Sequence, residues 1–256
     1  MKRTTALLAA LLCLAMAVQA QQKKSKFFAQ LTGGPSFPLG KFADKSYRFA
    51  EDNNQPEGLA KTGLSIQALV GYHLNETAGL LFLSGYSEHA QKASGFDEYL
   101  KQSILSAGLA TSKVDVKTTS WKIVKLMAGG FLNTPLTSDK DLVLVTKVTV
   151  GACKTAVPEY SFKGYVTDGV TTFSGTFNKT SLSWAFCYQV NMGLKYKLND
   201  KLHLLLDVNS FNATPQKEYT FNPPPNPNGP QSPMRQQKVK YKMAELNTLV
   251  GIGFDF

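Results

Sequence analysis

Residues 182–198 alternate between two kinds of side chain, and this alternation limits the fold more than any other feature of the sequence. The apolar side chains occupy the even-numbered positions: Leu182, Trp184, Phe186, Tyr188, Val190, Met192, Leu194, Tyr196 and Leu198. Because successive side chains of a β-strand point to opposite faces, a period of two predicts a strand with one apolar face. Strands in soluble domains average about 5–6 residues, whereas a strand that crosses a bilayer needs about 9–11. The length of this run therefore favours a membrane-spanning strand.

Three other segments repeat the same alternation. Their mostly apolar faces are Leu64, Ile66, Ala68, Val70, Tyr72 and Leu74; Leu142, Leu144, Thr146, Val148 and Val150; and Ala244, Leu246, Thr248, Val250, Ile252, Phe254 and Phe256. The pattern is less regular in residues 26–33, 77–88, 117–131 and 201–211. Together with 182–198, these segments predict eight strands.

The links between the expected strands alternate in length. Short links fall at residues 73–76, 133–140 and 199–201, and long links at 34–60, 89–115, 154–179 and 212–238. Transmembrane barrels have short periplasmic turns and long external loops, and an even number of strands. The sequence thus predicts an all-β fold, an eight-stranded antiparallel up-and-down transmembrane β-barrel with short periplasmic turns and four long external loops. A soluble β-sandwich is the alternative.

The first twenty residues have the parts of an export signal. Lys2 and Arg3 precede an apolar run over residues 6–18, and Val18-Gln19-Ala20 resembles a cleavage site. We interpret 1–20 as a cleaved signal peptide and 21–256 as the barrel domain. Cys13 would be lipidated in a lipoprotein, but it follows Leu11 and Leu12 rather than a small residue. The mature chain has no apolar run of the ~18 residues that a membrane helix needs.

The charge of the mature chain bears on its partners. Without Lys2 and Arg3, the 28 basic residues become 26, against 18 acidic residues, so the net charge is +8. This charge predicts a cationic solvated surface, or affinity for lipopolysaccharide or host polyanions. Basic and aromatic residues do not interleave as they do in nucleic-acid-binding proteins, so no nucleic acid is expected.

Strand parity predicts which polar side chains point into the barrel. The expected inward set is Lys147, Gln189, Asn191, Asp207 and Glu245. Lys147 and Asp207 should lie at similar depth. An eight-stranded barrel is only wide enough for its own side chains, so we expect a polar and ionic network that fills the lumen. A selectivity filter or a proton path is the alternative.

Catalytic and metal sites are not indicated. The three histidines are His73, His89 and His203, and only His89 is expected near the external rim. Its neighbour Glu88 must point to the opposite face of the strand and cannot easily orient it. No residues have metal-ligand spacing, and no phosphate-binding or dinucleotide motif is present, so no cofactor is expected.

Cys153 and Cys187 both have inward parity, on neighbouring strands near the external end. They could form a disulfide in an oxidising compartment or remain two free buried thiols.

Three of the loops contain structural signals of their own. Ser94 and Asp97 resemble a capping box at the start of a short helix that ends near Gly108. Asp168-Gly169 predicts a turn between residues 160–165 and 171–175, which would form a hairpin above the membrane. The proline-rich stretch 221–230 favours an extended conformation.

The ending Val250-Gly-Ile-Gly-Phe-Asp-Phe256 and the stretch Gly34-Pro-Ser-Phe-Pro-Leu-Gly-Lys-Phe42 resemble segments of the small outer-membrane β-barrel domain family. The resemblance covers essentially the whole mature chain. It implies export through the periplasm to the outer membrane of a Gram-negative bacterium. It also implies that Ile252, Phe254 and Phe256 are recognised by the outer-membrane assembly machinery. The family has no shared catalytic residues, so none are carried over.

These observations give a leading functional hypothesis and two alternatives. The first is a non-enzymatic integral outer-membrane barrel whose external loops bind a surface or host ligand, with lipopolysaccharide and other outer-membrane lipid around it. The alternatives are a narrow porin for small solutes and a lipid-modifying enzyme of the outer membrane.

Overall fold

The computed structural model describes residues 26–44, 58–106, 111–166, 172–221 and 235–256. The expected signal peptide at 1–20, the Asp168-Gly169 turn and most of the proline-rich stretch lie outside the described residues.

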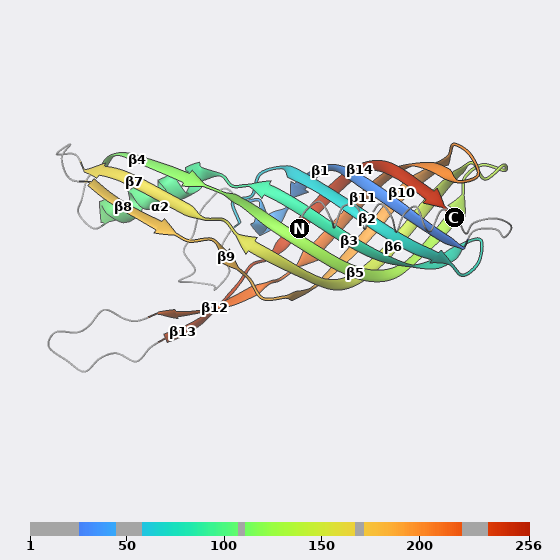
Figure 1. Ribbon diagram of the computed structural model, residues 1–256. Coiled ribbons are helices and arrows are strands. Elements are labelled where there is room, and N and C mark those ends of the chain that lie inside the picture. The colour runs from blue at the N-terminus through green and yellow to red at the C-terminus, as the bar shows by residue number, and fades with distance from the viewer. Residues whose placement is uncertain (1–25, 45–57, 107–110, 167–171, 222–234) are drawn as a thin grey trace, which may run out of the picture.

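Eight long strands form a closed antiparallel barrel (Figure 1). The strands are β1 (Phe27–Pro38), β2 (Gly63–His73), β3 (Ala78–Ala90), β5 (Ser120–Pro135), β6 (Leu142–Val157), β10 (Ala185–Lys197), β11 (Leu202–Ala213) and β14 (Met243–Asp255). Each strand pairs with the next in the chain, and β14 pairs with β1 to close the barrel. The predicted eight-stranded barrel is confirmed, and the soluble sandwich is wrong.

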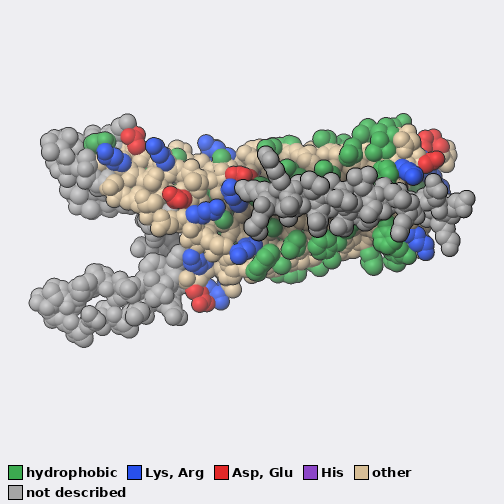
Figure 2. Space-filling view, viewed as in Figure 1, with side chains coloured by type: hydrophobic (Ala, Val, Ile, Leu, Met, Phe, Trp, Pro, Cys, Tyr) green, Lys and Arg blue, Asp and Glu red, His purple; other side chains and the backbone are tan. Residues whose placement is uncertain are grey.

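The two faces of the strands differ as the alternation predicts. In β10, Phe186, Val190 and Met192 are exposed, while Gln189 and Asn191 between them are buried in the interior. Figure 2 shows hydrophobic side chains over much of the barrel wall. An exposed apolar surface of this extent is unstable in water and is the lipid-facing band of a transmembrane barrel. Among the described residues, no helix has the length and apolar character needed to cross a membrane.

One strand begins later than the alternation predicts. Leu182 is expected to face lipid, but it is 2% exposed and packs in the interior. The reason is that the short strand β9 (Thr180–Ser181) pairs with the end of β6, and the Leu182 amide donates to the Thr155 carbonyl. The chain therefore enters the barrel wall only at Ala185.

The external loops carry further structure beyond the barrel (Figure 1). The elements are η1 (Gly40–Phe42), α2 (Ala93–Ser106), β4 (Thr111–Thr118), β7 (Tyr160–Val166), β8 (Thr172–Phe177), β12 (Gln216–Phe221) and β13 (Arg235–Lys240). The helix and the β7–β8 hairpin are confirmed. Strand β4 is not foreseen by the alternation, because its partner β7 lies in a different loop. The three strands β4, β7 and β8 form one external sheet, and β12 and β13 form a separate hairpin.

Candidate functional site: a filled lumen

An ion pair lies in the middle of the barrel. Lys147 Nζ on β6 is 2.9 Å from Asp207 Oδ2 on β11, and it also donates to Gln30 Oε1 at 3.1 Å. All three side chains are buried. The two charges that the sequence places at similar depth thus meet inside the lumen, each with a partner that offsets part of its desolvation cost.

Side-chain amides lie next to this ion pair. Gln67 and Gln189 exchange hydrogen bonds of 3.4 and 3.3 Å across the barrel, and Asn247 Nδ2 donates to Asn209 Oδ1 at 2.8 Å. Asn191 is buried as expected, but its Oδ1 atom has no hydrogen-bond partner in the described part of the chain. The two glutamines therefore bond through the centre of the barrel from opposite walls, whereas the two asparagines bond between adjacent strands.

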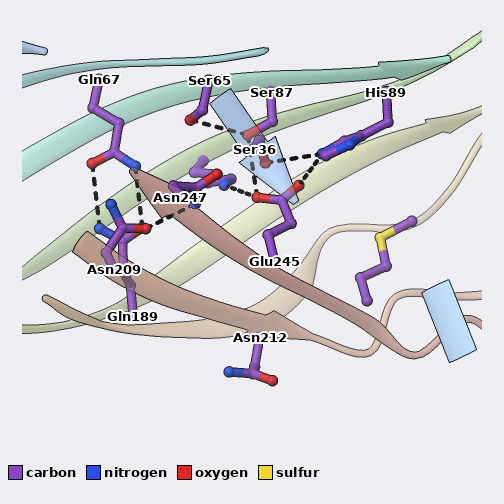
Figure 3. A network of polar contacts seen from close by, with 12 residues as sticks. Ser36, Ser65, Gln67, Ser87, His89, Gln189, Asn209, Asn212, Glu245 and Asn247 are labelled. Atoms are coloured by element: carbon purple, nitrogen blue, oxygen red, sulfur yellow. Dashed lines mark hydrogen bonds and ion pairs between the residues drawn. The ribbon is translucent and has the colours of Figure 1, made fainter. Parts of the chain in front are cut away.

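Glu245 is the centre of a second cluster of charged and polar groups (Figure 3). It lies near the start of β14, towards the external end. Its Oε2 atom accepts from Lys125 Nζ at 2.5 Å and from Ser87 Oγ at 3.2 Å, and its Oε1 atom lies 3.0 Å from His89 Nε2. The Lys125, His89 and Glu245 side chains are completely buried. The Lys125 ammonium also lies 3.8 Å from the centroid of the Phe211 ring.

Strand parity predicts that Glu245 lies inside the barrel, but three residues of its cluster, Lys125, His89 and Ser36, are not predicted. Lys125 and His89 have the same odd-numbered parity as the inward residues of β5 and β3. That parity could have indicated their direction. It could not have indicated that they converge on Glu245. Ser36 Oγ, which lies 3.2 Å from His89 Nε2, had no such signal, since β1 has a less regular pattern.

A serine, a histidine and a glutamate thus meet in the lumen, but their geometry differs from that of a catalytic triad. In a triad the serine and the acid bond to opposite ring nitrogens of the histidine. Here Ser36 and Glu245 both lie at Nε2, while Nδ1 faces the Lys61 carbonyl at 2.9 Å. A carbonyl only accepts hydrogen bonds, so Nδ1 is a donor and His89 is held in place from both sides.

Aromatic side chains close the external end of the lumen. Phe42 of η1 packs edge-on against Trp121 with ring centroids 5.6 Å apart, and Trp121 packs against Tyr241 at 5.7 Å. Trp121 Nε1 also donates to the Gly58 carbonyl at 2.7 Å. The first loop therefore folds back over the mouth of the barrel, where its aromatic residue is fully buried.

A second aromatic layer lies at the end with the short turns. Phe28 contacts His73 and Phe131 with ring centroids 4.9 and 5.2 Å apart. Beside this layer, Asp255 Oδ2 lies 2.8 Å from His203 Nε2 and 3.4 Å from Lys195 Nζ. The polar middle of the lumen thus lies between the external aromatic cluster and this second aromatic layer.

The two cysteines lie on neighbouring strands. Cys153 on β6 pairs in register with Ala185, and Cys187 on β10 pairs with Gly151, so the two cysteines are offset by two residues. Both are buried free thiols. The two thiols are therefore unbonded in this structure, and a disulfide between them stays a prediction.

The residues expected to act in assembly lie on the closing strand. Ile252 and Phe254 are exposed on the lipid face, and the ring centroids of Phe254 and Phe256 are 5.9 Å apart. Their recognition by assembly machinery stays a prediction. Within the described ranges, no group of three or more His, Cys, Asp or Glu side chains could hold a metal ion.

The central ion pair leaves no room for a larger residue at Gly193, which faces Asp207 across the strand pair. A Cβ atom at this position would overlap Asp207 Oδ1 and lie 2.8 Å from the Leu206 carbonyl oxygen. We expect Gly193→Ala to lower the free energy of unfolding by about 1–3 kcal/mol, because the carboxylate must move away from Lys147. The measurement is a urea titration of the protein refolded in phospholipid vesicles.

Gly85→Ala is the matched control, since Gly85 is also buried in a barrel strand. The atoms nearest to its added Cβ would be 3.5 and 3.6 Å away, which is ordinary contact. Its free energy of unfolding should stay within about 0.5 kcal/mol of the wild-type value. Equal urea midpoints for the two variants would show that the stability of the barrel does not depend on the observed position of the Asp207 carboxylate.

Solved structures resemble the chain in outline. They include the outer membrane protein OprG from Pseudomonas aeruginosa (11% identity, TM-score 0.46, covering 91% of this chain and 96% of that one). A major outer membrane protein from Thermus thermophilus has 13% identity and a TM-score of 0.44, covering 91% and 100%. Neisserial surface protein A has 9% identity and a TM-score of 0.43, covering 90% and 97%. No protein-family model and no curated protein sequence matches the chain.

Identities of 9–13% and TM-scores below 0.5 are too low to assign the protein. The assignment therefore rests on the features of the barrel itself. Its strands close into a ring, its outer wall is apolar and its interior is polar and ionic. Single-chain antiparallel barrels with an even number of strands and this distribution of side chains span bacterial outer membranes. The chain is a small eight-stranded β-barrel of the outer membrane.

Proposed function

We propose that this protein is a non-conducting, non-enzymatic barrel that acts through its external loops. The observation that carries the proposal is the filled lumen. Buried ion pairs occupy its middle, and an aromatic layer lies at each end. A solute that entered would have to break hydrogen bonds between opposite walls and leave buried charges without partners, which is costly. The narrow porin is therefore the weaker candidate.

The external loops support the second part of the proposal, because they pack against each other. Leu59 of the first loop packs with Leu100 of α2, and Tyr160, Val116 and Phe162 of the external sheet join the same cluster. Gln91 Nε2 bonds both the Tyr160 hydroxyl, at 2.6 Å, and the Gly58 carbonyl, at 3.3 Å. A surface that is ordered before binding loses less conformational entropy when a partner docks, so this arrangement suits a binding surface.

The lipid-modifying enzyme has less support. His89 is the histidine that the sequence places near the external rim, and it is buried inside the barrel with no exposure to lipid. An acyl transfer reaction needs a nucleophile and a base that reach the substrate in the outer leaflet. Ser36 and His89 both point into the lumen, where the aromatic layer of Phe42 and Trp121 covers them.

Conductance through planar lipid bilayers tests the closed lumen. The purified protein should give no stepwise current at any voltage the bilayer tolerates, because the hydrogen-bonded walls and the aromatic layers leave no continuous water path. A general porin inserted into the same bilayers serves as the positive control. A heat-dependent shift in gel mobility, measured on the same preparation, should show that the barrel is folded. Reproducible current steps from folded protein would establish the narrow porin instead.

A further inference from the structure

A groove of about 700 Å³ lies on the outer wall of the barrel, at the external end of four adjacent strands. Residues from β10, β11 and β14 line it, together with the segment that follows β1. It forms where the β12–β13 hairpin leaves the barrel wall, and Figure 1 shows this hairpin pointing away from the external sheet. The groove therefore lies beside the fourth loop, and Ala213 and Met243 of the interior core form part of its lining.

One part of the groove is apolar. Phe186 and Tyr188 line it from the start of β10, Trp184 lines it from just before that strand, and Leu39 lines it from the segment after β1. Their exposed fractions are 66%, 47%, 53% and 41%, so these large side chains are open to the surroundings. Down the same face of β10, Val190 and Met192 continue the apolar surface into the lipid-facing band. Acyl chains of the outer leaflet can thus reach the groove without crossing a polar surface.

The other part of the groove is cationic. Lys41, Lys240 and Lys242 line it, all three are exposed, and no acidic residue is among its lining residues. The charge of the whole fourth loop has the same sign. Residues 214–242 contain five basic side chains and one acidic side chain: Lys217, Arg235, Lys238, Lys240, Lys242 and Glu218. The groove therefore attracts anions where the apolar wall ends.

The position of the groove limits what can occupy it. Tryptophan and tyrosine concentrate at the level of lipid headgroups, and Trp184 and Tyr188 lie beside the lysines. A soluble polyanion would meet the lysines but gain nothing from the apolar part. A lipid without net negative charge would fill the apolar part but leave the lysines without partners. The chemistry that satisfies both parts is a lipid with acyl chains and phosphate groups.

We propose that this groove binds one phosphorylated lipid of the outer leaflet, the lipid A part of lipopolysaccharide. Lys41, Lys240 and Lys242 pair with its phosphate groups, and an acyl chain lies against Trp184 and Phe186. The site goes beyond the proposed function, since a closed lumen and a binding surface on the external loops do not require it. Bound lipid would hold the base of the β12–β13 hairpin at the membrane surface.

The test uses Trp184 as a reporter of the groove. The chain has only two tryptophans, so Trp121→Phe leaves Trp184 as the single one. This variant is placed in bilayers of brominated phospholipid, which quench the fluorescence of a lipid-exposed tryptophan. Lipid A, whose chains carry no bromine, is then titrated in. We expect saturable recovery of fluorescence as lipid A displaces brominated lipid from the groove.

Two double variants in the Trp121→Phe background separate the groove from general charge. Lys240→Gln with Lys242→Gln should raise the lipid A concentration for half-recovery about tenfold or more. Lys217→Gln with Lys238→Gln removes the same charge from the same hairpin. Neither of these lysines lines the groove, and Lys238 lies 3.5 Å from Glu218. This control should change the half-recovery concentration less than twofold.

Three results would overturn the proposal. The first is recovery that does not saturate, and the second is an equal half-recovery concentration for both double variants. The third is equal recovery with dephosphorylated lipid A, which would remove the role of the lysines. Inorganic phosphate is added in a separate experiment. It should neither restore the fluorescence of Trp184 nor compete with lipid A. Competition at equal concentration would mean that the groove recognises phosphate alone. Bilayer conductance is unaffected by any of these outcomes, so the site and the closed lumen can fail separately.

Discussion

Replacing Glu245 with glutamine is expected to lower the free energy of unfolding by about 3–5 kcal/mol. Glu245 is completely buried, and its carboxylate is the partner of the Lys125 ammonium and of His89. Glutamine has nearly the same shape, so packing is kept and the loss comes from charge. Without the carboxylate, Lys125 becomes a buried charge that keeps its contact with the Phe211 ring, and such a charge carries most of its desolvation penalty.

A urea titration in phospholipid vesicles, followed by tryptophan fluorescence, measures this change. Glu88→Gln is the control, because Glu88 is the other glutamate of this region with a lysine partner. Its carboxylate lies 3.9 Å from Lys122 Nζ on the outer surface, and both side chains are 40% or more exposed. An exposed pair of this kind contributes about 0–1 kcal/mol.

A rescue variant separates loss of a charge partner from loss of shape. Lys125→Met combined with Glu245→Gln removes both buried charges, and it should recover most of the stability that Glu245→Gln alone loses. If Glu245→Gln unfolds at the same urea concentration as Glu88→Gln, the buried ion pair does not stabilise the barrel. If the double variant is no more stable than Glu245→Gln, the loss comes from the shape or the hydrogen bonds of Glu245.

Trp121→Ala is expected to cost about 3–5 kcal/mol, as large-to-small changes in a packed core do. Trp121 is 1% exposed and contacts Phe42 and Tyr241, so alanine would leave a cavity at the external end of the lumen. The change also removes the donor that bonds the Gly58 carbonyl. We therefore expect two effects of Trp121→Ala. The barrel becomes less stable, and the first loop is held less firmly over the mouth of the lumen.

Trp184→Ala is the matched control, because Trp184 is the only other tryptophan of the chain and is 53% exposed on the outer wall. It should change the free energy of unfolding by less than about 1 kcal/mol. Each variant keeps one tryptophan, so both transitions can be followed by fluorescence. Protease cleavage near Gly58, whose carbonyl loses its Trp121 donor, should become faster in Trp121→Ala only. Equal stability of the two variants would mean that Trp121 is not part of the core that closes the mouth.

Much of the barrel could be predicted from the sequence, because the direction of a side chain in a strand is a local property. Gln189, Asp207 and Glu245 were expected to point inward from parity alone, and all three are buried. The number and order of strands followed from the same period and from the alternation of loop lengths. Where a strand is interrupted, the local rule fails, as at Leu182, whose position depends on pairing between β9 and β6.

The partners of the inward residues could not be predicted in the same way. Glu245 is 120 positions from Lys125 and 156 from His89 in the sequence. They meet because the closed barrel sets the stagger and tilt of strands that are not neighbours in the chain. The same holds for β4, whose partner β7 belongs to another loop.

The sequence by itself therefore determined the eight barrel strands, the face on which their side chains lie except where a strand is interrupted, and the location in the outer membrane. These follow from the two-residue period of the strand and from the exclusion of unpaired backbone from lipid. Only the tertiary structure decided which buried charges meet, that aromatic layers close both ends of the lumen, and that the fourth loop bends away to leave a groove beside three lysines. Those features depend on closure of the barrel, because closure brings side chains from strands that are far apart in the sequence to the same depth in the lumen.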